Sequence, residues 1–219
     1  VCLSGKHEDL VATDHAAMEV IDPTRRYQDR DNYNWIRDAE KNQLVVGTQA
    51  RILYQDCMGR VNIALKFNEL VREGKIGPVM LGRDHHDVSG TDSPFRETSN
   101  IKDGSNVCAD MATQCYAGNA ARGMSLIALH NGGGVGIGKS INGGFGLVLD
   151  GSEQVDEIIK SAIAWDTMGG VARRSWARND HAIETSIEYN KMNQGTDHIT
   201  IPYLAEQSSI DAAINALFD

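Results

Sequence analysis

The sequence has few cysteines, no long apolar run and little positive charge, and each absence excludes a class of protein. Its four cysteines form no C-x-x-C pair, so no disulfide framework is indicated and a reducing, cytoplasmic setting is expected. No apolar run approaches the roughly 20 residues that span a bilayer. The formal net charge of −9 argues against a nucleic-acid or membrane-surface partner, because such partners require a basic surface.

The amino terminus lacks the charged and apolar regions of a secretory signal, and it begins with Val1 instead of methionine. We therefore expect the chain to be cut from a longer protein. Its 219 residues suffice for one large domain or two small ones. With 41% hydrophobic and 23% charged residues, the composition is typical of soluble globular proteins.

Hydrophobic periodicity predicts that helices and strands alternate along the chain. Helices are expected over 61–71, 107–121, 153–165, 179–192 and 209–218, and strands over 79–81, 126–129, 147–149 and 199–201. This alternation predicts an α/β fold with a mixed or largely parallel sheet flanked by helices. We expect a helical arm or cap at 1–45, an α/β core at 46–205 and a terminal helix at 206–219.

A densely charged loop follows the strand predicted at 79–81. After Gly82 the chain carries Arg83, Asp84, His85, His86 and Asp87, and then Asp92, Arg96 and Glu97. So many titratable side chains would be costly to bury as core, and ligands of open α/β sheets bind beyond the carboxyl ends of strands. We therefore predict an active-site loop here.

Two alternatives for this loop stay open. It could be an acidic, solvated surface loop, since loops are polar in any case. It could also bind a metal ion through His85, His86 and Asp87. Adjacent residues of an extended segment point to opposite sides, however, so His85 and His86 do not readily share one ion, and no metal site is predicted.

A glycine-rich segment from His130 to Gly146 contains, at Gly133–Ser140, the G-x-x-x-x-G-K-S pattern of a P-loop. A P-loop also needs a helix that begins at its Lys-Ser, whereas several glycines follow here and would each disfavour a helix. We interpret the segment as a backbone cradle for a phosphate-bearing ligand. A tight glycine-rich β-turn is the alternative without a ligand.

Several motifs together resemble the urocanase family (urocanate hydratases). They are Gln49–Tyr54, Gly82–Asp87, Ser93–Thr98, Asp103–Ser105, His130–Gly136, Asp150-Gly151 and Gly170–Arg174. They occur in the family's order, and the resemblance extends from about Leu3 to about Ala177. It implies a cytoplasmic lyase of histidine degradation that adds water to urocanate, giving imidazolone propionate.

The resemblance also implies tightly bound NAD⁺, whose nicotinamide ring acts as an electron sink. Complete urocanases are longer and carry a dinucleotide-binding Rossmann domain upstream of the part seen here. This chain shows no strand–GxGxxG–helix unit and is identified as the C-terminal domain alone. Its expected partners are urocanate, the rest of the urocanase chain and a second copy in a homodimer.

By the same resemblance, Gly134 contacts NAD⁺, and Gly132, Gly133 and Gly136 shape the backbone around it. Asp84, His85 and Asp87 are the predicted catalytic residues. Arg96 is the predicted anchor for the substrate carboxylate, assisted by Arg83. Many bacterial members carry an active cysteine at the position of Leu53. A leucine side chain cannot act as a nucleophile or as an acid.

Two functions of other classes remain as alternatives. One is a nucleotide-binding domain of P-loop type at Gly133–Ser140. The other is a non-catalytic scaffold or dimerisation domain. Loss of ATP binding on mutation of Lys139 would indicate the first. Activity restored on mixing with the missing upstream part would exclude the second.

Overall fold

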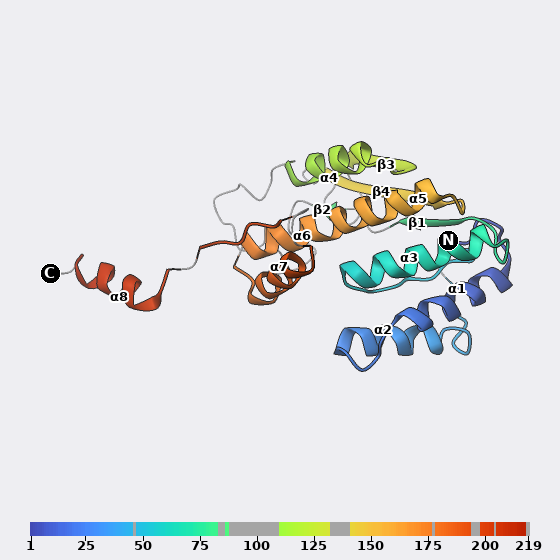
Figure 1. The fold of residues 1–219 in the computed structure, drawn as a ribbon, viewed down its shortest axis with the longest axis horizontal. Helices are drawn as coiled ribbons and strands as arrows, with labels where there is room; N and C mark the ends of the chain where they lie inside the picture. Colours follow the sequence, from blue (N-terminus) through green and yellow to red (C-terminus); the bar gives the residue numbers. More distant parts are fainter. Residues whose placement is uncertain are drawn as a thin grey trace. The chain divides into compact units, whose positions relative to one another are not determined.

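The computed structural model describes residues 1–45, 47–82, 86–87, 110–131, 141–176, 178–193, 198–203 and 205–217. Its elements, shown in Figure 1, are α1 (His7–Val20), α2 (Tyr27–Arg37), α3 (Cys57–Arg72), β1 (Val79–Gly82), β2 (His86–Asp87), α4 (Asp110–Ala121), β3 (Leu126–Asn131), β4 (Ile141–Leu149), α5 (Glu153–Ile158), the π-helical η2 (Ile159–Ile163), α6 (Ala164–Trp176), α7 (Asp180–Met192) and α8 (Gln207–Asn215). Two compact units divide the chain, Val1–Met168 and Gly169–Asp219.

Strand β4 is the centre of the sheet in the first unit. Gly146 pairs with both Gly82 of β1 and Leu126 of β3, and Gly143 pairs with both His86 of β2 and Leu129 of β3. Because a strand has only two edges, β1 and β2 share one edge of β4 and β3 occupies the other. The backbone of Val1 to Leu3 bonds to the outer edge of β1.

All pairings among the described strands are antiparallel, so the prediction of a largely parallel sheet is wrong. A parallel pair needs a crossover of a dozen or more residues, and the connection 132–140 between β3 and β4 is shorter than that. The predicted combination of a sheet with flanking helices is confirmed.

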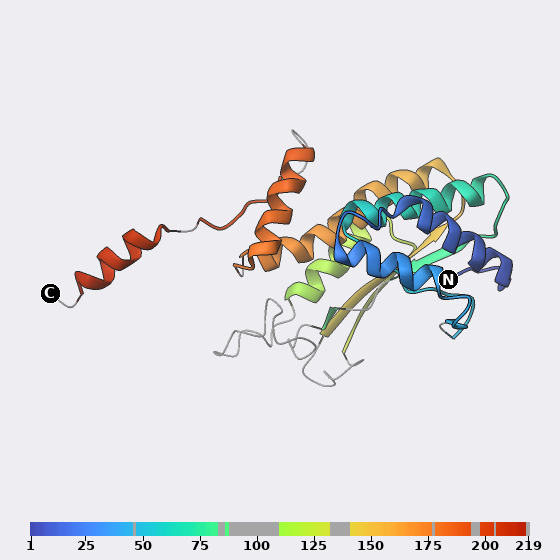
Figure 2. The same ribbon diagram turned by 90° about the horizontal axis from the view of Figure 1, so that it is seen from below.

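The core lies on one face of this sheet, the face on which the helices pack in Figure 2. Leu147 and Leu149 of β4 are completely buried, and alternation along the strand places both on this face. They belong to the same apolar cluster as Phe67 of α3 and Ile159 of η2. Burying a leucine side chain of this kind contributes about 1.5–3 kcal/mol, so this layer fixes the sheet beneath α3 and the α5–η2 helix.

The helix that precedes β1 begins and ends at recognisable signals. The Asp56 side chain caps α3 by accepting a hydrogen bond from Gly59 N at 2.8 Å. After α3, Gly74 adopts a positive φ of 69°, and the backbone bonds around it close the helix in a Schellman turn. The helix predicted at 61–71 is thus confirmed and is longer at its amino-terminal end.

A second glycine fixes the turn between β4 and α5. Gly151 has φ +87°, and a Cβ there would lie 2.8 Å from the backbone of Arg72. Its N–H donates to the fully buried Asn68, and its carbonyl accepts from Arg72 Nε at 2.7 Å. These contacts tie the end of α3 to the start of α5.

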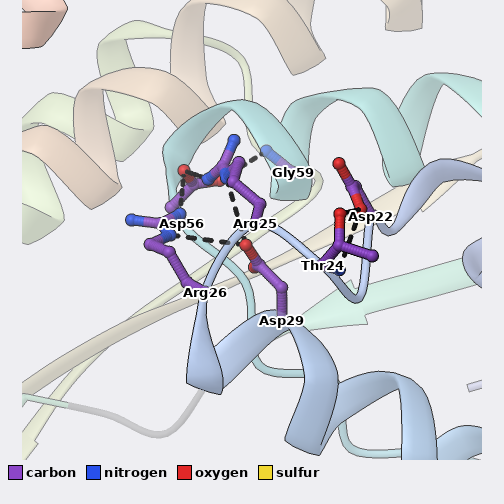
Figure 3. A network of polar contacts seen from close by, with 7 residues as sticks. All are labelled: Asp22, Thr24, Arg25, Arg26, Asp29, Asp56 and Gly59. Atoms are coloured by element: carbon purple, nitrogen blue, oxygen red, sulfur yellow. Dashed lines mark hydrogen bonds and ion pairs between the residues drawn. The ribbon is translucent and has the colours of Figure 1, made fainter.

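The first two helices belong to the same core as the sheet. Ala16 and Ala17 of α1, with Ile36 of α2, are buried in the cluster that contains the β4 leucines. Arg25 and Arg26, just before α2, both form ion pairs with Asp56, and both also contact Asp29 (Figure 3). The division at 45/46 and 205/206 stays a prediction, whereas the contact boundary lies at Met168–Gly169.

The second unit contains α7 and α8. The Asn179 side chain caps α7 by accepting from Ala182 N at 3.0 Å. Asn190 then holds the backbone N–H and carbonyl of Ile199 at 2.8 Å each. The described residues 198–203 form no strand, so the strand predicted at 199–201 is wrong. The Asn190 side chain makes the hydrogen bonds with the Ile199 backbone that a neighbouring strand would otherwise make.

Candidate functional site

The candidate site lies at the end of the sheet where β4 begins. Asn142 of β4 pairs with Asp87 of β2 on one side and with His130 of β3 on the other. Paired Cα atoms of antiparallel strands are about 4.5–5.5 Å apart, so these three backbones form one continuous row. The chain leaves both β2 and β3 at this end, and it enters β4 here at Ile141.

This register brings the flanks of the two predicted motifs together. The charged loop lies on both sides of β2 in the sequence, and the glycine-rich segment joins β3 to β4. The two motifs are far apart along the chain, yet they are anchored on neighbouring strands of one sheet end. Side chains on both could therefore act on one ligand.

Most of the predicted site residues lie outside the described residues. They are Arg83, Asp84, His85, Arg96, Gly132, Gly133, Gly134 and Gly136. The backbone of Asp87 is placed in β2. The roles assigned to all of these residues therefore stay predictions, and what the structure contributes is the position of the strands that carry them.

The P-loop alternative lacks its structural context. A P-loop requires a helix directly after its Lys-Ser, so that the helix amino terminus faces the phosphates. Here strand β4 begins at Ile141, immediately after Ser140. The strand predicted at 147–149 therefore starts earlier and includes Gly143, Gly144 and Gly146. Pairing holds these glycines in the sheet, since Gly143 and Gly146 pair on both edges and Gly144 pairs with Ala128 of β3.

Leu53, the position at which the family resemblance implies a cysteine in bacterial members, is partly buried. It packs against the core and lines a cavity of about 40 Å³ together with Cys2, Asp14, Arg51 and Leu81. Cys2 therefore lies beside Leu53 in this cavity and is a candidate for the role of the bacterial cysteine. Its thiol is buried, and burial raises its pKa, which reduces its nucleophilic form at neutral pH.

Cys57, the cysteine nearest to Leu53 in the sequence, is the first residue of α3 and is also buried. Burial is the main cause that raises its pKa to about 11. At neutral pH this side chain is therefore a thiol with almost no thiolate, and it is a poor candidate for the role of the bacterial cysteine.

The segment before α3 is anchored by a buried ion pair. Arg51 donates from Nε and Nη2 to the two carboxylate oxygens of Asp14 in α1, at 2.9 and 2.7 Å. Both side chains are nearly inaccessible, at 5% and 8% exposure. This bidentate contact fixes the guanidinium, and with it the backbone that carries Leu53.

Sequence reasoning did not single out Arg51, Asp14 or Cys2. Arg51 stands inside the motif Gln49–Tyr54, which carries part of the family resemblance, and Asp14 interrupts the buried face of α1. A carboxylate in the middle of such a face is the signal that could have indicated a buried cationic partner.

The part of the chain that the structure describes contains neither a metal-ligand cluster nor a membrane-spanning helix. Its histidine, cysteine and acidic side chains form no group of three or more that could hold a metal ion. Among the described helices, none is both long and apolar enough to cross a membrane.

Comparison with known proteins identifies the family. The model of the urocanase C-terminal domain matches residues 1–188. The chain belongs to the urocanase C-terminal domain family. Similar curated proteins are urocanate hydratase from Mus musculus (50% identical over 224 residues, 98% of this chain), probable urocanate hydratase from Caenorhabditis elegans (51% over 216 residues, 94%) and urocanate hydratase from Homo sapiens (49% over 219 residues, 96%).

The matched region is a minor part of each of these relatives. It covers 33%, 32% and 32% of their lengths, respectively. This urocanase C-terminal domain thus spans about a third of the length of the curated relatives that it matches.

Proposed function

We propose that the chain is the C-terminal part of a urocanate hydratase, which adds water to urocanate to give imidazolone propionate in histidine degradation. The observation that carries this proposal is the family match over residues 1–188. The relatives' names supply the reaction, and their identity to this chain extends over nearly its whole length.

The register at the sheet end supports a shared site. Asp87 and His130 flank Asn142 across three strands, so the charged loop and the glycine-rich segment are anchored next to each other. Urocanate has a carboxylate at one end and an imidazole at the other. We assign Arg96 and Arg83 to the carboxylate, because a guanidinium can bind both of its oxygens, and Asp84, His85 and Asp87 to proton transfer.

NAD⁺ is part of the proposal, and its contacts are assigned to Gly132, Gly133, Gly134 and Gly136. Gly146, in the described part of the glycine-rich segment, leaves no room for a cofactor. The space where a side chain of Gly146 would lie is taken by Met80, whose Cε would be 2.2 Å from an added Cβ. We therefore derive no reaction step through this cofactor.

The decisive experiment is reconstitution. The 219-residue chain, the upstream part of its own protein and their mixture are assayed for loss of the ultraviolet absorbance of urocanate, with and without NAD⁺. We expect turnover only when both parts are present, because the sequence of this chain contains no G-x-G-x-x-G pattern of a dinucleotide-binding Rossmann unit. Turnover that is equal without this chain would refute its part in the reaction.

A variant links the activity to the predicted loop. Arg96→Lys in the active protein should mainly raise KM, because a lysine cannot bind both carboxylate oxygens in one fork. Arg37→Lys is the control, since Arg37 is exposed and contacts the neighbouring Asp38. If Arg96→Lys behaves like the control, Arg96 is not the anchor.

A homodimer and a cytoplasmic location complete the proposal, since the family resemblance implies both. Analytical ultracentrifugation of the reconstituted protein tests the first, and fractionation of the source cells tests the second. A protein that sediments as a monomer while turning over urocanate would remove the homodimer from the proposal.

A further inference from the structure

The sheet face opposite the core is apolar at the end away from the candidate site. Leu147 and Leu149 of β4 point into the core, so alternation along the strand places Val148 on the opposite face. Met80 of β1 pairs with Val148 and lies on that face as well. Leu126 of β3 joins them, because its partner Gly146 is two residues from Val148.

The first residues of the chain extend this face beyond β1. Val1 and Met80 exchange two backbone hydrogen bonds, of 2.9 and 2.8 Å, so they lie directly opposite each other and share a face. Leu3 N donates to Pro78 O at 2.9 Å, and alternation places both of these residues on the same face. We call six apolar residues the outer sheet face: Val1, Leu3, Pro78, Met80, Leu126 and Val148.

The outer sheet face is exposed and continuous. Leu126, Leu3 and Val1 are 54%, 49% and 43% exposed, and Met80 and Val148 are partly exposed. Met80 and Leu126 meet above Gly146, since a Cβ added to this glycine would lie 2.2 Å from Met80 Cε and 3.3 Å from Leu126 Cβ. Contiguous exposed apolar surface of this kind marks interaction sites.

The sequences of the strands also indicate a sheet that is covered on both faces. An antiparallel strand with one face in water alternates apolar and polar residues, whereas a strand buried on both faces is apolar throughout. The segments 79–81, 126–129 and 147–149 are uninterrupted apolar runs in β1, β3 and β4. The helices that pack on the sheet in Figure 2 cover its core face, so these runs indicate a further layer on the outer sheet face.

We propose that the upstream part of this protein packs on the outer sheet face with an apolar surface of its own. The family match is to the C-terminal domain, and the chain covers 33% of the length of the mouse relative. The upstream part is therefore joined at Val1, which is itself a residue of the outer sheet face. This interaction surface goes beyond the proposed function, which concerns the other end of the sheet.

The size of the face favours this occupant over a second copy of the chain. A stable interface between separate molecules has about 20–30 residues on each side, and the outer sheet face is far smaller. A segment joined at Val1 meets the face within one molecule, at a high effective concentration, so a small apolar surface is sufficient.

The first test measures whether the face is covered in the complete protein, in which this chain is joined to its upstream part. Leu126→Cys is treated with N-ethylmaleimide in buffer and in urea, and peptide mass spectrometry follows the labelling at position 126 alone. The folded protein should react at least about 100-fold more slowly than the unfolded one, because a buried thiol reacts only through opening. The control is Arg37→Cys, since the Arg37 side chain is 53% exposed and lies on α2. It should react at nearly the same rate in both states.

The second test identifies what covers the face. An amino acid with a diazirine side chain replaces Leu126 in the complete protein, and light then links it to the group that it contacts. We expect a cross-link to a peptide of the upstream part, in a product that migrates as a single chain on a denaturing gel.

Three results would overturn the proposal. The first is labelling of Leu126→Cys as fast as that of Arg37→Cys in the folded protein, which would mean that the face is open to water. The second is a cross-linked product of two chains, which would mean that a second copy covers the face. The third is cross-linking confined to the 219 residues of this chain. None of these measurements depends on turnover of urocanate, so they leave the proposed function untouched.

Discussion

Breaking the buried ion pair between Arg51 and Asp14 should destabilise the fold far more than breaking an exposed pair. Both side chains are over nine-tenths buried and joined by two hydrogen bonds of 2.9 and 2.7 Å. Removing one partner leaves an uncompensated charge in a medium that solvates it poorly. Such changes cost about 3–5 kcal/mol, so we expect this loss for Arg51→Met and for Asp14→Leu.

Urea unfolding monitored by circular dichroism measures the effect. With a slope of about 2 kcal/mol per molar urea, a loss of 3–5 kcal/mol lowers the midpoint by about 1.5–2.5 M. The control is Arg37→Met, which removes the pair between Arg37 and Asp38, whose side chains are 53% and 43% exposed. Exposed pairs contribute about 0–1 kcal/mol, so its midpoint should hardly move.

The double variant Asp14→Leu/Arg51→Met separates the charge from the packing. With both charges removed, no unpaired group stays buried, and buried pairs replaced by apolar side chains are often neutral or stabilising. The double variant should therefore be more stable than either single variant. If the two single losses simply add, or if Arg51→Met behaves like Arg37→Met, the argument from burial is wrong.

Three further predictions follow from local geometry and from the charged loop. Gly151→Ala should lower the free energy of unfolding by about 2 kcal/mol or more, because φ is +87° and a Cβ would lie 2.8 Å from the α3 backbone. Gly74→Ala, where φ is +69° and the space is open, should lower it by only about 1 kcal/mol in the same urea assay. The hydrogen bond that His7 Nε2 donates to the Glu40 carboxylate is the main cause that raises the pKa of His7. The stabilisation from this bond is thus present below the unfolded-state pKa of about 6.5 and is lost as the pH rises through the folded pKa. An NMR titration of Glu40→Gln should show a lower His7 pKa. Asp84→Asn in the active protein should lower kcat by about 10²-fold or more at similar KM, and near-normal turnover would transfer the assignment to another group of the loop.

Local signals were sufficient to predict most of the secondary structure. The helix at α3 follows from apolar spacing and from the glycine that ends it, and β1 and β3 follow from short apolar runs. The sheet topology was not accessible in the same way, because an alternation of helices and strands does not state which strands pair. The length of the connection 132–140 was the signal that favoured a hairpin.

The glycines of β4 explain why the start of this strand was missed. Gly143, Gly144 and Gly146 have weak strand propensity, and propensity alone placed the strand start at Leu147. Tertiary contacts decide otherwise: β4 pairs on both edges, and Gly146 makes room for Met80. The ion pair between Arg51 and Asp14 could not be predicted for a related reason. The two residues are 37 positions apart, and contacts at such a separation leave no local pattern in the sequence.

The contact between Met80 and Gly146 offers a direct test of the register that brings the two loops together. Both lie on the sheet face opposite Leu147, and a Cβ on Gly146 would lie 2.2 Å from Met80 Cε. Met80 Cε is the end of a flexible, partly exposed side chain and can move aside, so Gly146→Ala should destabilise the fold by only about 0.5–1 kcal/mol, and Met80→Ala should relieve that cost. We expect a coupling of about 0.5 kcal/mol in the double-mutant cycle, as for residues in contact, and additivity for Met80→Ala with the distant Gly74→Ala. If the Met80–Gly146 cycle is also additive, then Met80 does not lie over Gly146, and the register of β1 on β4, from which the argument that one sheet end anchors both motifs starts, loses this support.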